Sequence, residues 1–402
     1  MKKMNVLFIG YWNLDDPLTS ATIFPHLSIL SKHDRVNSLI FTNTQREMGS
    51  VEKVNYLKES GIVYYPLLSQ NYHLTLITKI IDFVTFPKKI LKICQDNSVD
   101  LIIARGAPAG ALALLVTNKN DLPFVVESFE PHADYMLETG TWSKYDPRFI
   151  AQKHWEGKIK KKAKFILTVS ENYESFLKKE GVAPDKVFTA PCGVNIKKFF
   201  YDPYKSQDVR KNLNIPSGTK VAIYVGKFGG IYYGDEIFIL LKKMLSYYND
   251  NLFVIILSNI EEEEFRKKCF LYAISSNNVK KLFVPHEEVN AYLSAADFAV
   301  APYRKTKVSK YLSPVKVGEY LAAGLPVLIT EGVGDEMNYL ERNHLGVTLN
   351  IHMMDEDTYF KSKMDKINKI VEIRDHGYFV KNALKYRSFE VVENLYDKIL
   401  NA

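Results

Sequence analysis

The sequence predicts an α/β protein with two domains of similar size, each built on a parallel sheet with helices on both faces. Short, continuous apolar segments alternate with helical segments over nearly all of the 402 residues, which is the pattern of parallel strands buried on both sides. The alternation breaks once, between 191 and 216. A chain of this length also exceeds the usual limit for a single core.

The first domain is expected over residues 1–195. Its predicted strands are short apolar runs at 6–9, 36–41, 62–65, 100–104, 123–127 and 164–169. Gly10 and a polar loop follow the first strand, and a helical segment follows the loop, which is how a nucleotide-binding α/β unit begins. Ligands of such sheets bind at the carboxyl ends of the strands, so the residues that follow each strand are the candidates for function.

Polar and charged residues follow two of these strands. Arg105 comes directly after one strand and is expected to present its guanidinium at the sheet edge. The next strand leads into Glu130 and His132, groups that can accept or carry a proton. A turn held by local side-chain hydrogen bonds is the alternative for that segment. Ser170, after a later strand, is expected to be a helix N-cap and no more.

Residues 196–216 show no clear apolar period and are interpreted as a linker. The second domain is expected over 217–386, with strands at 220–225, 252–257, 279–284, 297–301 and 326–330. An amphipathic helix within 387–402 is expected to pack back on the body of the protein.

A glycine-rich loop at 226–234 follows the first strand of this second series. Gly226 and Gly229 would allow the backbone to approach a ligand closely, and Lys227 could neutralise a phosphate. Because parallel strands end at the same edge of a sheet, this loop should open beside the helix that begins near Ser313.

That helix is the strongest candidate site. Ser313 is expected to cap it, Pro314 fits its first position, and Gly324 ends it. The free N–H groups and the dipole of the helix start attract an anion, and Lys316 in the first turn adds a positive charge. Glu319, about one turn further on, could accept hydrogen bonds from ligand hydroxyls, and phosphate beside polyol describes a nucleotide sugar. An ordinary capped amphipathic helix is the alternative.

Composition argues for a soluble enzyme of the cytoplasm. No apolar run is long enough to span a bilayer, and the apolar part of the N-terminus is too short for a secretory signal. Three scattered cysteines form neither a disulfide framework nor a metal cluster. The net charge of +7 is modest, and no nucleic acid partner is expected. Basic runs at 87–92 and 158–164 are either solvated helix faces or contacts with anionic lipid, which would place the protein at the inner face of the membrane.

The order of these motifs resembles the retaining glycosyltransferases of family 4, which have the GT-B fold. Residues 313–327 are similar to the Ser-Pro-x-Lys-x-x-Glu-Tyr-Leu-Ala-x-Gly-x-Pro-Val variant of that family's donor motif, a long and specific match. Other segments resemble the Gly-Arg diphosphate loop, the nucleobase segment and the crossing between domains: 224–227, 285–297 and 186–195.

The resemblance implies two Rossmann-like domains whose sheets face a central cleft, and sugar transfer without a bound metal or cofactor. It implies that the second domain binds a nucleotide-diphosphate sugar and the first a glycan or lipid-linked acceptor. Glu319 would bind the ribose, while Lys316 and the backbone of Ser313, Pro314 and Val315 would bind the diphosphate. Lys227 would stabilise the leaving group, and His132 would touch the transferred sugar. Arg105 and Glu130 are assigned to the acceptor side.

The sequence departs from the family pattern at two positions. Tyr311 stands where the first of two glutamates is usual, and Tyr233 where a lysine is usual beyond the Gly-Arg loop. Lys316 is expected to supply the missing positive charge. Two other functions stay open: a sugar-nucleotide epimerase on the same fold, for which Glu127, Glu130 and His132 would handle protons, and a non-catalytic binding partner.

Overall fold

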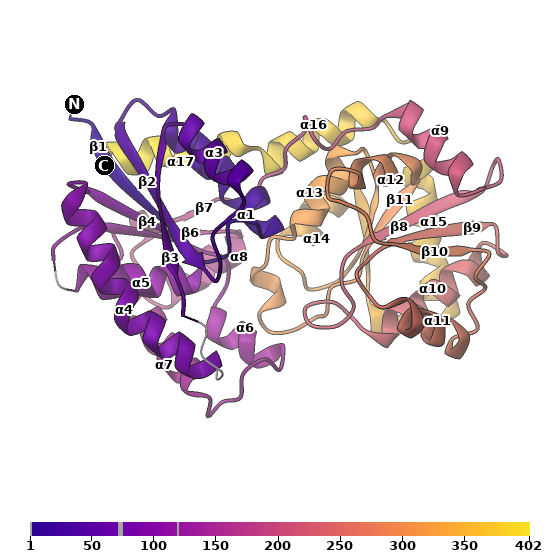
Figure 1. Cartoon of the computed structure of the whole chain (residues 1–402). Helices are drawn as coiled ribbons and strands as arrows, with labels where there is room; N and C mark the ends of the chain where they lie inside the picture. The colour runs from indigo at the N-terminus through magenta and orange to yellow at the C-terminus, as the bar shows by residue number, and fades with distance from the viewer. Residues whose placement is uncertain (1, 71–74, 119) are drawn as a thin grey trace. The chain divides into compact units, whose positions relative to one another are not determined.

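The computed structural model describes residues 2–70, 75–118 and 120–402, and the chain forms two compact α/β units (Figure 1). Unit 1 comprises Met1–Pro191 and Phe389–Ala402, and unit 2 comprises Cys192–Ser388. Each is built on a parallel sheet, of seven strands in unit 1 and six in unit 2. The predicted fold class is therefore confirmed.

Unit 1 alternates strands and helices from its start. Its strands are β1 (Met4–Gly10), β2 (Val36–Gln45), β3 (Ile62–Leu68), β4 (Leu101–Arg105), β5 (Phe124–Ser128), β6 (Phe165–Thr168) and β7 (Val187–Thr189). Its helices are α1 (Pro17–Thr22), α2 (Phe24–Ser31), α3 (Val51–Glu59), α4 (Thr75–Asp96), α5 (Ala107–Thr117), α6 (His132–Glu138), α7 (Pro147–Lys162), α8 (Glu171–Lys179) and α17 (Phe389–Asn401).

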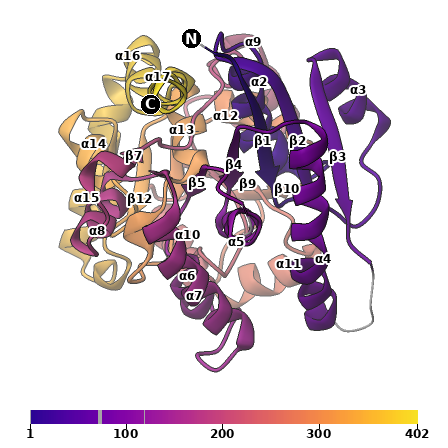
Figure 2. The ribbon, with the colours of Figure 1, turned by 90° about the vertical axis from the view of Figure 1, so that its left-hand side faces the viewer.

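The sheet of unit 1 has the strand order β3-β2-β1-β4-β5-β6-β7. Its central strands are buried on both faces, so continuous apolar segments such as Val6–Ile9 suit them. Helix α5 is buried along most of its length, and Gly110 lets it approach β5, since a Cβ there would lie 3.0 Å from Val126. Helices α4 and α7 flank α5, as Figure 2 shows.

Unit 2 has the same kind of alternation. Its strands are β8 (Lys220–Val225), β9 (Leu252–Leu257), β10 (Val279–Leu282), β11 (Phe298–Ala301), β12 (Val327–Thr330) and β13 (Gly346–Leu349). Its helices are α9 (Pro203–Asn212), α10 (Asp235–Tyr247), α11 (Glu262–Leu271), α12 (Val289–Ala295), α13 (Val315–Ala322), α14 (Glu336–Arg342), α15 (Asp357–Glu372) and α16 (His376–Arg387).

The sheet of unit 2 has the order β10-β9-β8-β11-β12-β13, so the direction of winding reverses between β8 and β11. In parallel α/β sheets a ligand binds at such a reversal, outside the carboxyl ends of the two strands. The glycine-rich loop follows β8, and the segment that leads into α13 follows β11. The fold therefore brings the two candidate segments of unit 2 to one place.

Two strands and one helix add to the sequence prediction. β7 and β13 are the outermost strands on one side of their sheets, and both are short and partly polar, as edge strands often are. Within 196–216, the segment interpreted as a linker, α9 forms behind its N-cap Asp202 and packs on α12 as part of unit 2.

The last helix, α17, belongs to unit 1 although the preceding residues belong to unit 2. Its apolar face is buried, with Val392, Tyr396, Ile399 and Leu400 at most 2% exposed. These side chains join the core that contains Leu27 and Leu30 of α2. Burial of this apolar stripe accounts for the position of α17.

Candidate functional site

The loops that follow β8 and β11 are joined to each other by backbone hydrogen bonds. The N–H of Tyr233 donates to the carbonyl of Pro302 at 3.0 Å, and the N–H of Arg304 donates to that of Ile231 at 2.8 Å. Tyr232 and Tyr303 also form an antiparallel bridge, with ring centroids 4.7 Å apart. The two loops that flank the reversal of the sheet therefore support one another.

Glycine is required where the loop leaves β8. A Cβ on Gly226 would lie 2.8 Å from the hydroxyl of Tyr224, which itself donates to the carbonyl of Lys227. Gly229 has φ +78°, which favours glycine. The side chain of Lys227 is exposed, and no carboxylate of the described residues pairs with it. The N–H of Gly226 donates to the carbonyl of Leu257 and is therefore not available to a ligand. What Gly226 can provide is close approach of a ligand to the backbone.

The structure corrects the expected cap of α13. Its N-cap is Pro314, and Val315 is the first helical residue. The hydroxyl of Ser313 accepts hydrogen bonds from the N–H of Cys192, at 3.1 Å, and from the buried guanidinium of Arg387. Because those partners hold the Ser313 hydroxyl, no side chain caps the helix. The first N–H groups of α13 therefore remain available to an anion.

Lys316 and Glu319 form an ion pair on α13. The Lys316 Nζ lies 2.7 Å from the Glu319 Oε2, and Nε2 of His286 lies 4.0 Å from the other carboxylate oxygen. The Glu319 side chain is only 3% exposed, whereas that of Lys316 is 25% exposed. The carboxylate is therefore held at the bottom of the site and the ammonium nearer to solvent. Burial lowers the pKa of His286, and the nearby Lys198 acts in the same direction.

The adjacent residues Tyr232 and Tyr233 of the glycine-rich loop have different neighbours. The phenol of Tyr232 lies within the electrostatic field of Lys316 and Glu319, and burial raises its pKa. Tyr233 is 5% exposed and its hydroxyl bonds to the backbone of Lys305. Of these two tyrosines, Tyr232 is thus the one near the Lys316–Glu319 pair, and its hydroxyl is hydrogen-bonded to that of Tyr303. Tyr311, at the position of the missing glutamate, is buried at the end of a short 3-10 helix, Ser309–Tyr311.

In unit 1, Arg105 is buried and its charge is paired. Its guanidinium contacts the carboxylate of Glu127, which is also bonded to the hydroxyl of Tyr396 and lies 3.2 Å from Nδ1 of His26. Burial raises the pKa of Glu127, but His26 and Arg105 outweigh it and the pKa is lowered. Arg105 is only 4% exposed. The Arg105 guanidinium is therefore buried at the sheet edge and is not exposed to a ligand there. Its role in acceptor binding stays a prediction.

Glu130 and His132 are brought together just beyond β5. The Glu130 Oε1 lies 2.8 Å from Nδ1 of His132, which is the first residue of α6. Burial would lower the pKa of His132, but the hydrogen bond and charge of Glu130 outweigh it, and the pKa is raised. Because Nδ1 is held by Glu130, Nε2 is the nitrogen left to meet a ligand. The ring of Trp142 packs edge-on against the imidazole, with centroids 5.7 Å apart.

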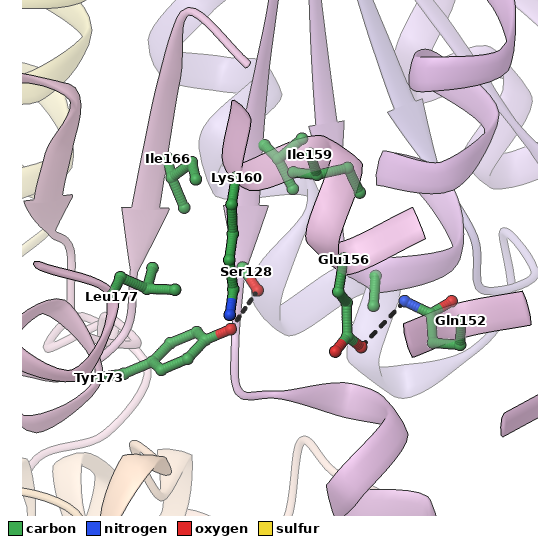
Figure 3. A pocket seen from close by; sticks show the side chains of 10 residues that line it. Ser128, Gln152, Glu156, Ile159, Lys160, Ile166, Tyr173 and Leu177 are labelled. Atoms are coloured by element: carbon green, nitrogen blue, oxygen red, sulfur yellow. Dashed lines mark hydrogen bonds between the residues drawn. The ribbon is translucent and has the colours of Figure 1, made fainter. Parts of the chain in front are cut away.

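A small cavity lies behind this segment, among β5, α7 and α8 (Figure 3). Its volume of about 20 Å³ suits a single water and is far too small for a sugar. Glu156 lines it, bonds to Gln152 at 3.1 Å, and accepts the N–H of Ala133 at 2.9 Å. The residues around this cavity therefore hold α6 in place, and the cavity is not a substrate site.

Sequence reasoning missed Tyr232, Glu156 and Arg387. Tyr232 lies in a loop that was recognised, yet no periodicity tells which of two adjacent tyrosines turns toward α13. The roles of Glu156 and Arg387 depend on partners distant in the chain, namely Ala133 and Ser313. The expected capping role of Ser170 is confirmed, because its hydroxyl accepts the N–H of Tyr173 at 3.2 Å.

The described residues offer neither a cluster of metal ligands nor a helix that could span a membrane. Over 2–70, 75–118 and 120–402, no group of three or more His, Cys, Asp and Glu side chains is placed to hold a metal ion. In the same residues, every helix is too short or too polar to cross a membrane.

No protein-family model matches the chain. In sequence it is 26% identical over 252 residues to TuaC of Bacillus subtilis, assigned as a teichuronic acid biosynthesis glycosyltransferase. This match covers 62% of the chain and 58% of TuaC. The protein therefore has a glycosyltransferase homologue, and the chain spans little more than half of it.

Solved structures match over nearly the whole chain. Sucrose-phosphate synthase of Thermosynechococcus elongatus has a TM-score of 0.73 at 14% identity and covers 99% of this chain and 98% of its own. HepE of Anabaena, solved in complex with UDP, has a TM-score of 0.65 at 14% identity, covering 99% and 100%. A UDP-N-acetylglucosamine 2-epimerase has a TM-score of 0.59 at 14% identity, covering 98% and 96%. At these identities the likeness establishes the GT-B fold and no more.

Proposed function

We propose that the protein is a retaining glycosyltransferase of family 4. It would transfer a sugar from a nucleotide-diphosphate sugar to a glycan or lipid-linked saccharide. This reaction would take place in the cytoplasm, as a step in the synthesis of a surface polysaccharide. The observation that carries this proposal is the buried carboxylate of Glu319, which lies beside Lys316 on an uncapped helix at the reversal of the unit 2 sheet. The likeness to TuaC supports the same activity.

The donor is proposed to bind with its diphosphate at the start of α13. The N–H groups of Val315 and Lys316 and the helix dipole face that position. Negative charge develops on the diphosphate as the glycosidic bond breaks, so Lys316 and Lys227 would stabilise the transition state in place of a metal ion. The Glu319 carboxylate, one turn below, would accept hydrogen bonds from the ribose hydroxyls.

His132 is proposed to contact a hydroxyl of the transferred sugar through Nε2. Glu130 fixes the ring through Nδ1 and favours its protonated form, which makes Nε2 a hydrogen-bond donor. Glu130 is thus better explained as a positioning residue than as a direct contact of the acceptor.

Donor binding and stereochemistry test the proposal together. The full chain should bind one class among uridine-, guanosine-, adenosine- and thymidine-diphosphate sugars in a calorimetric titration, and Glu319→Ala should lose that binding. Glu263→Ala, which removes an 82%-exposed side chain of α11, is the matched control and should bind as the wild type does. With an acceptor present, NMR of the product glycoside should then show the transferred sugar in the anomeric configuration that it had in the donor. Absence of binding to every donor, or an inverted product, would contradict the proposal.

The epimerase remains a second candidate, because a 2-epimerase shares the fold and the Glu130–His132 pair can handle a proton. It predicts that UDP-N-acetylglucosamine alone is converted to a second UDP-N-acetylhexosamine, which the transferase does not do. Nucleotide-sugar binding without any turnover would instead favour the non-catalytic partner.

A further inference from the structure

Helix α4 exposes a stripe of large aliphatic side chains. Ile77, Ile80 and Val84 are 43%, 56% and 58% exposed. Their spacing of three and four residues places them on one side of the helix. The opposite side packs into unit 1 through Phe86 and Ile90, which are at most 1% exposed. The core therefore leaves the outer stripe uncovered, and a contiguous exposed apolar stripe marks an interaction surface.

Helix α7, which lies on the other side of α5, meets α4 through one pair of aromatic rings and also exposes an aliphatic side chain. The rings of Phe83 on α4 and Trp155 on α7 stack with centroids 4.7 Å apart. Both helices return the chain from the carboxyl end of one parallel strand to the start of the next, so they run in the same direction. Ile150, in the first turn of α7, is 58% exposed. The exposed aliphatic groups thus gather toward the starts of both helices.

Lysines follow the aliphatic residues along both helices. Lys88 and Lys92 continue the α4 stripe beyond Val84, and Lys158 and Lys161 continue the α7 side beyond Ile150. All four are exposed, and no carboxylate among the described residues pairs with them. We call these lysines and the four exposed aliphatic residues the docking face.

The carboxylates in the middle of the two helices do not offset this charge. Asp82 on α4 accepts hydrogen bonds from the hydroxyl of Ser69 and is 4% exposed. Glu156 on α7 accepts the N–H of Ala133 and points toward the small cavity (Figure 3). Both are held by neutral donors inside unit 1. The exposed carboxylate of Asp96, at the end of α4, offsets one of the lysines, so the outer surface keeps a net positive charge beside its apolar part.

We propose that the docking face binds the surface of a bilayer that contains anionic lipid. Aliphatic side chains would enter the boundary between head groups and acyl chains, and lysines would meet the negative surface potential. Lysine is suited to this boundary because its aliphatic stem can remain in the apolar layer while its ammonium reaches the phosphates. A surface with both groups is complementary to anionic lipid, whereas either group alone is common on soluble proteins.

The docking face also has a suitable place in the fold. Its aliphatic end lies at the carboxyl edge of the unit 1 sheet, and α6, which begins with His132, packs on α7. A lipid-linked acceptor bound at this edge would then enter from the bilayer; this step rests on the proposed function, whereas the docking itself does not.

Cosedimentation of the full chain with lipid vesicles tests the docking. The wild type should pellet with phosphatidylcholine vesicles that contain about one-third phosphatidylglycerol, and should remain in solution with pure phosphatidylcholine or at high salt. Ile80→Ser with Val84→Ser should lower partitioning about tenfold, and Lys88→Gln with Lys92→Gln by a similar factor. Both changes are at exposed positions, and an unchanged melting temperature verifies that the variants fold.

Phe270→Ser is the matched control, because Phe270 of α11 in unit 2 is 90% exposed and lies outside the docking face. It should pellet as the wild type does. The proposal is overturned if the wild type does not pellet with anionic vesicles. It is also overturned if Phe270→Ser abolishes pelleting and the α4 variants do not. A dimer that only the Ile80 and Val84 changes dissociate would also overturn it, by assigning the face to a second copy. Donor binding, measured in the same variants, separates a failure of docking from a failure of the proposed activity.

Discussion

Removal of either partner of the Lys316–Glu319 pair should have unequal effects on stability. In Lys316→Met the Glu319 carboxylate, 3% exposed, loses the ammonium that lies 2.7 Å away. Removing one partner of a buried pair costs about 3–5 kcal/mol, and the partial exposure of Lys316 argues for the lower end, about 3 kcal/mol. In Glu319→Gln the remaining ammonium is 25% exposed and can be hydrated, so we expect about 1 kcal/mol.

These values correspond to distinct shifts of the melting temperature. For a domain of 150–250 residues, which is the size class of unit 2, 1 kcal/mol shifts Tm by about 2–4 °C. Lys316→Met should therefore lower the Tm of unit 2 by about 6–12 °C and Glu319→Gln by about 2–4 °C. The double variant should be more stable than Lys316→Met alone, because a neutral amide is less costly to bury than an unpaired carboxylate.

Scanning calorimetry of the full chain provides the assay, and Lys267→Met is the matched control. Lys267 pairs with Glu263 on α11, but both side chains are at least 74% exposed, so this pair should contribute little. The reasoning fails if Lys316→Met shifts Tm no more than Lys267→Met, or if Glu319→Gln is the more damaging change. Lys316 would then be a solvated cation available to a diphosphate, and not the partner of Glu319.

Glu130→Gln should lower the pKa of His132, measured by NMR titration of the imidazole. Glu130 raises that pKa in the folded protein, so the pair stabilises the fold fully below about pH 6.5, and this stabilisation is lost as pH rises through the folded pKa. Compared with the wild type, Glu130→Gln should therefore be less stable mainly at acidic pH. Tyr232→Phe should weaken donor binding about fivefold by calorimetry, since one hydrogen-bonding group beside the ion pair is lost, and unchanged affinity would remove Tyr232 from the site. Arg387→Met should destabilise unit 2 by about 3–5 kcal/mol in urea unfolding, because it leaves the buried carboxylate of Glu336 unpaired; a loss below about 1 kcal/mol would contradict this.

The sequence was sufficient to bring the two candidate segments of unit 2 together. Strands buried on both faces must be continuously apolar, so β8 and β11 could be recognised without knowledge of their neighbours. Parallel strands end at a common edge, so the residues that follow them could be expected to meet. Gly226 and the start of α13 were accordingly predicted together. The structure places Gly226 directly after β8, and α13 at the end of the segment that follows β11, and these are the two strands that flank the reversal of the sheet.

The partners of the site residues could not be predicted in the same way. The hydroxyl of Ser313 is held by Arg387, more than 70 residues away, and therefore does not cap the helix. Arg105 is neutralised by Glu127 on the adjacent strand, so a residue expected at an open edge is buried instead. Such pairings depend on which side chains the fold brings together, and local propensity contains no information on that.

The α/β class, the parallel sheets and the segments at their carboxyl edges all follow from the sequence alone. These follow from short-range patterns of apolar residues, glycine and proline, whose conformational effects act within a few residues. The folded structure was needed to show that Lys316 is paired with Glu319, that Tyr232 and not Tyr233 lies near them, and that α4 turns aliphatic residues outward. Charge pairing and burial arise between segments distant in the chain, and they exist only once those segments have packed.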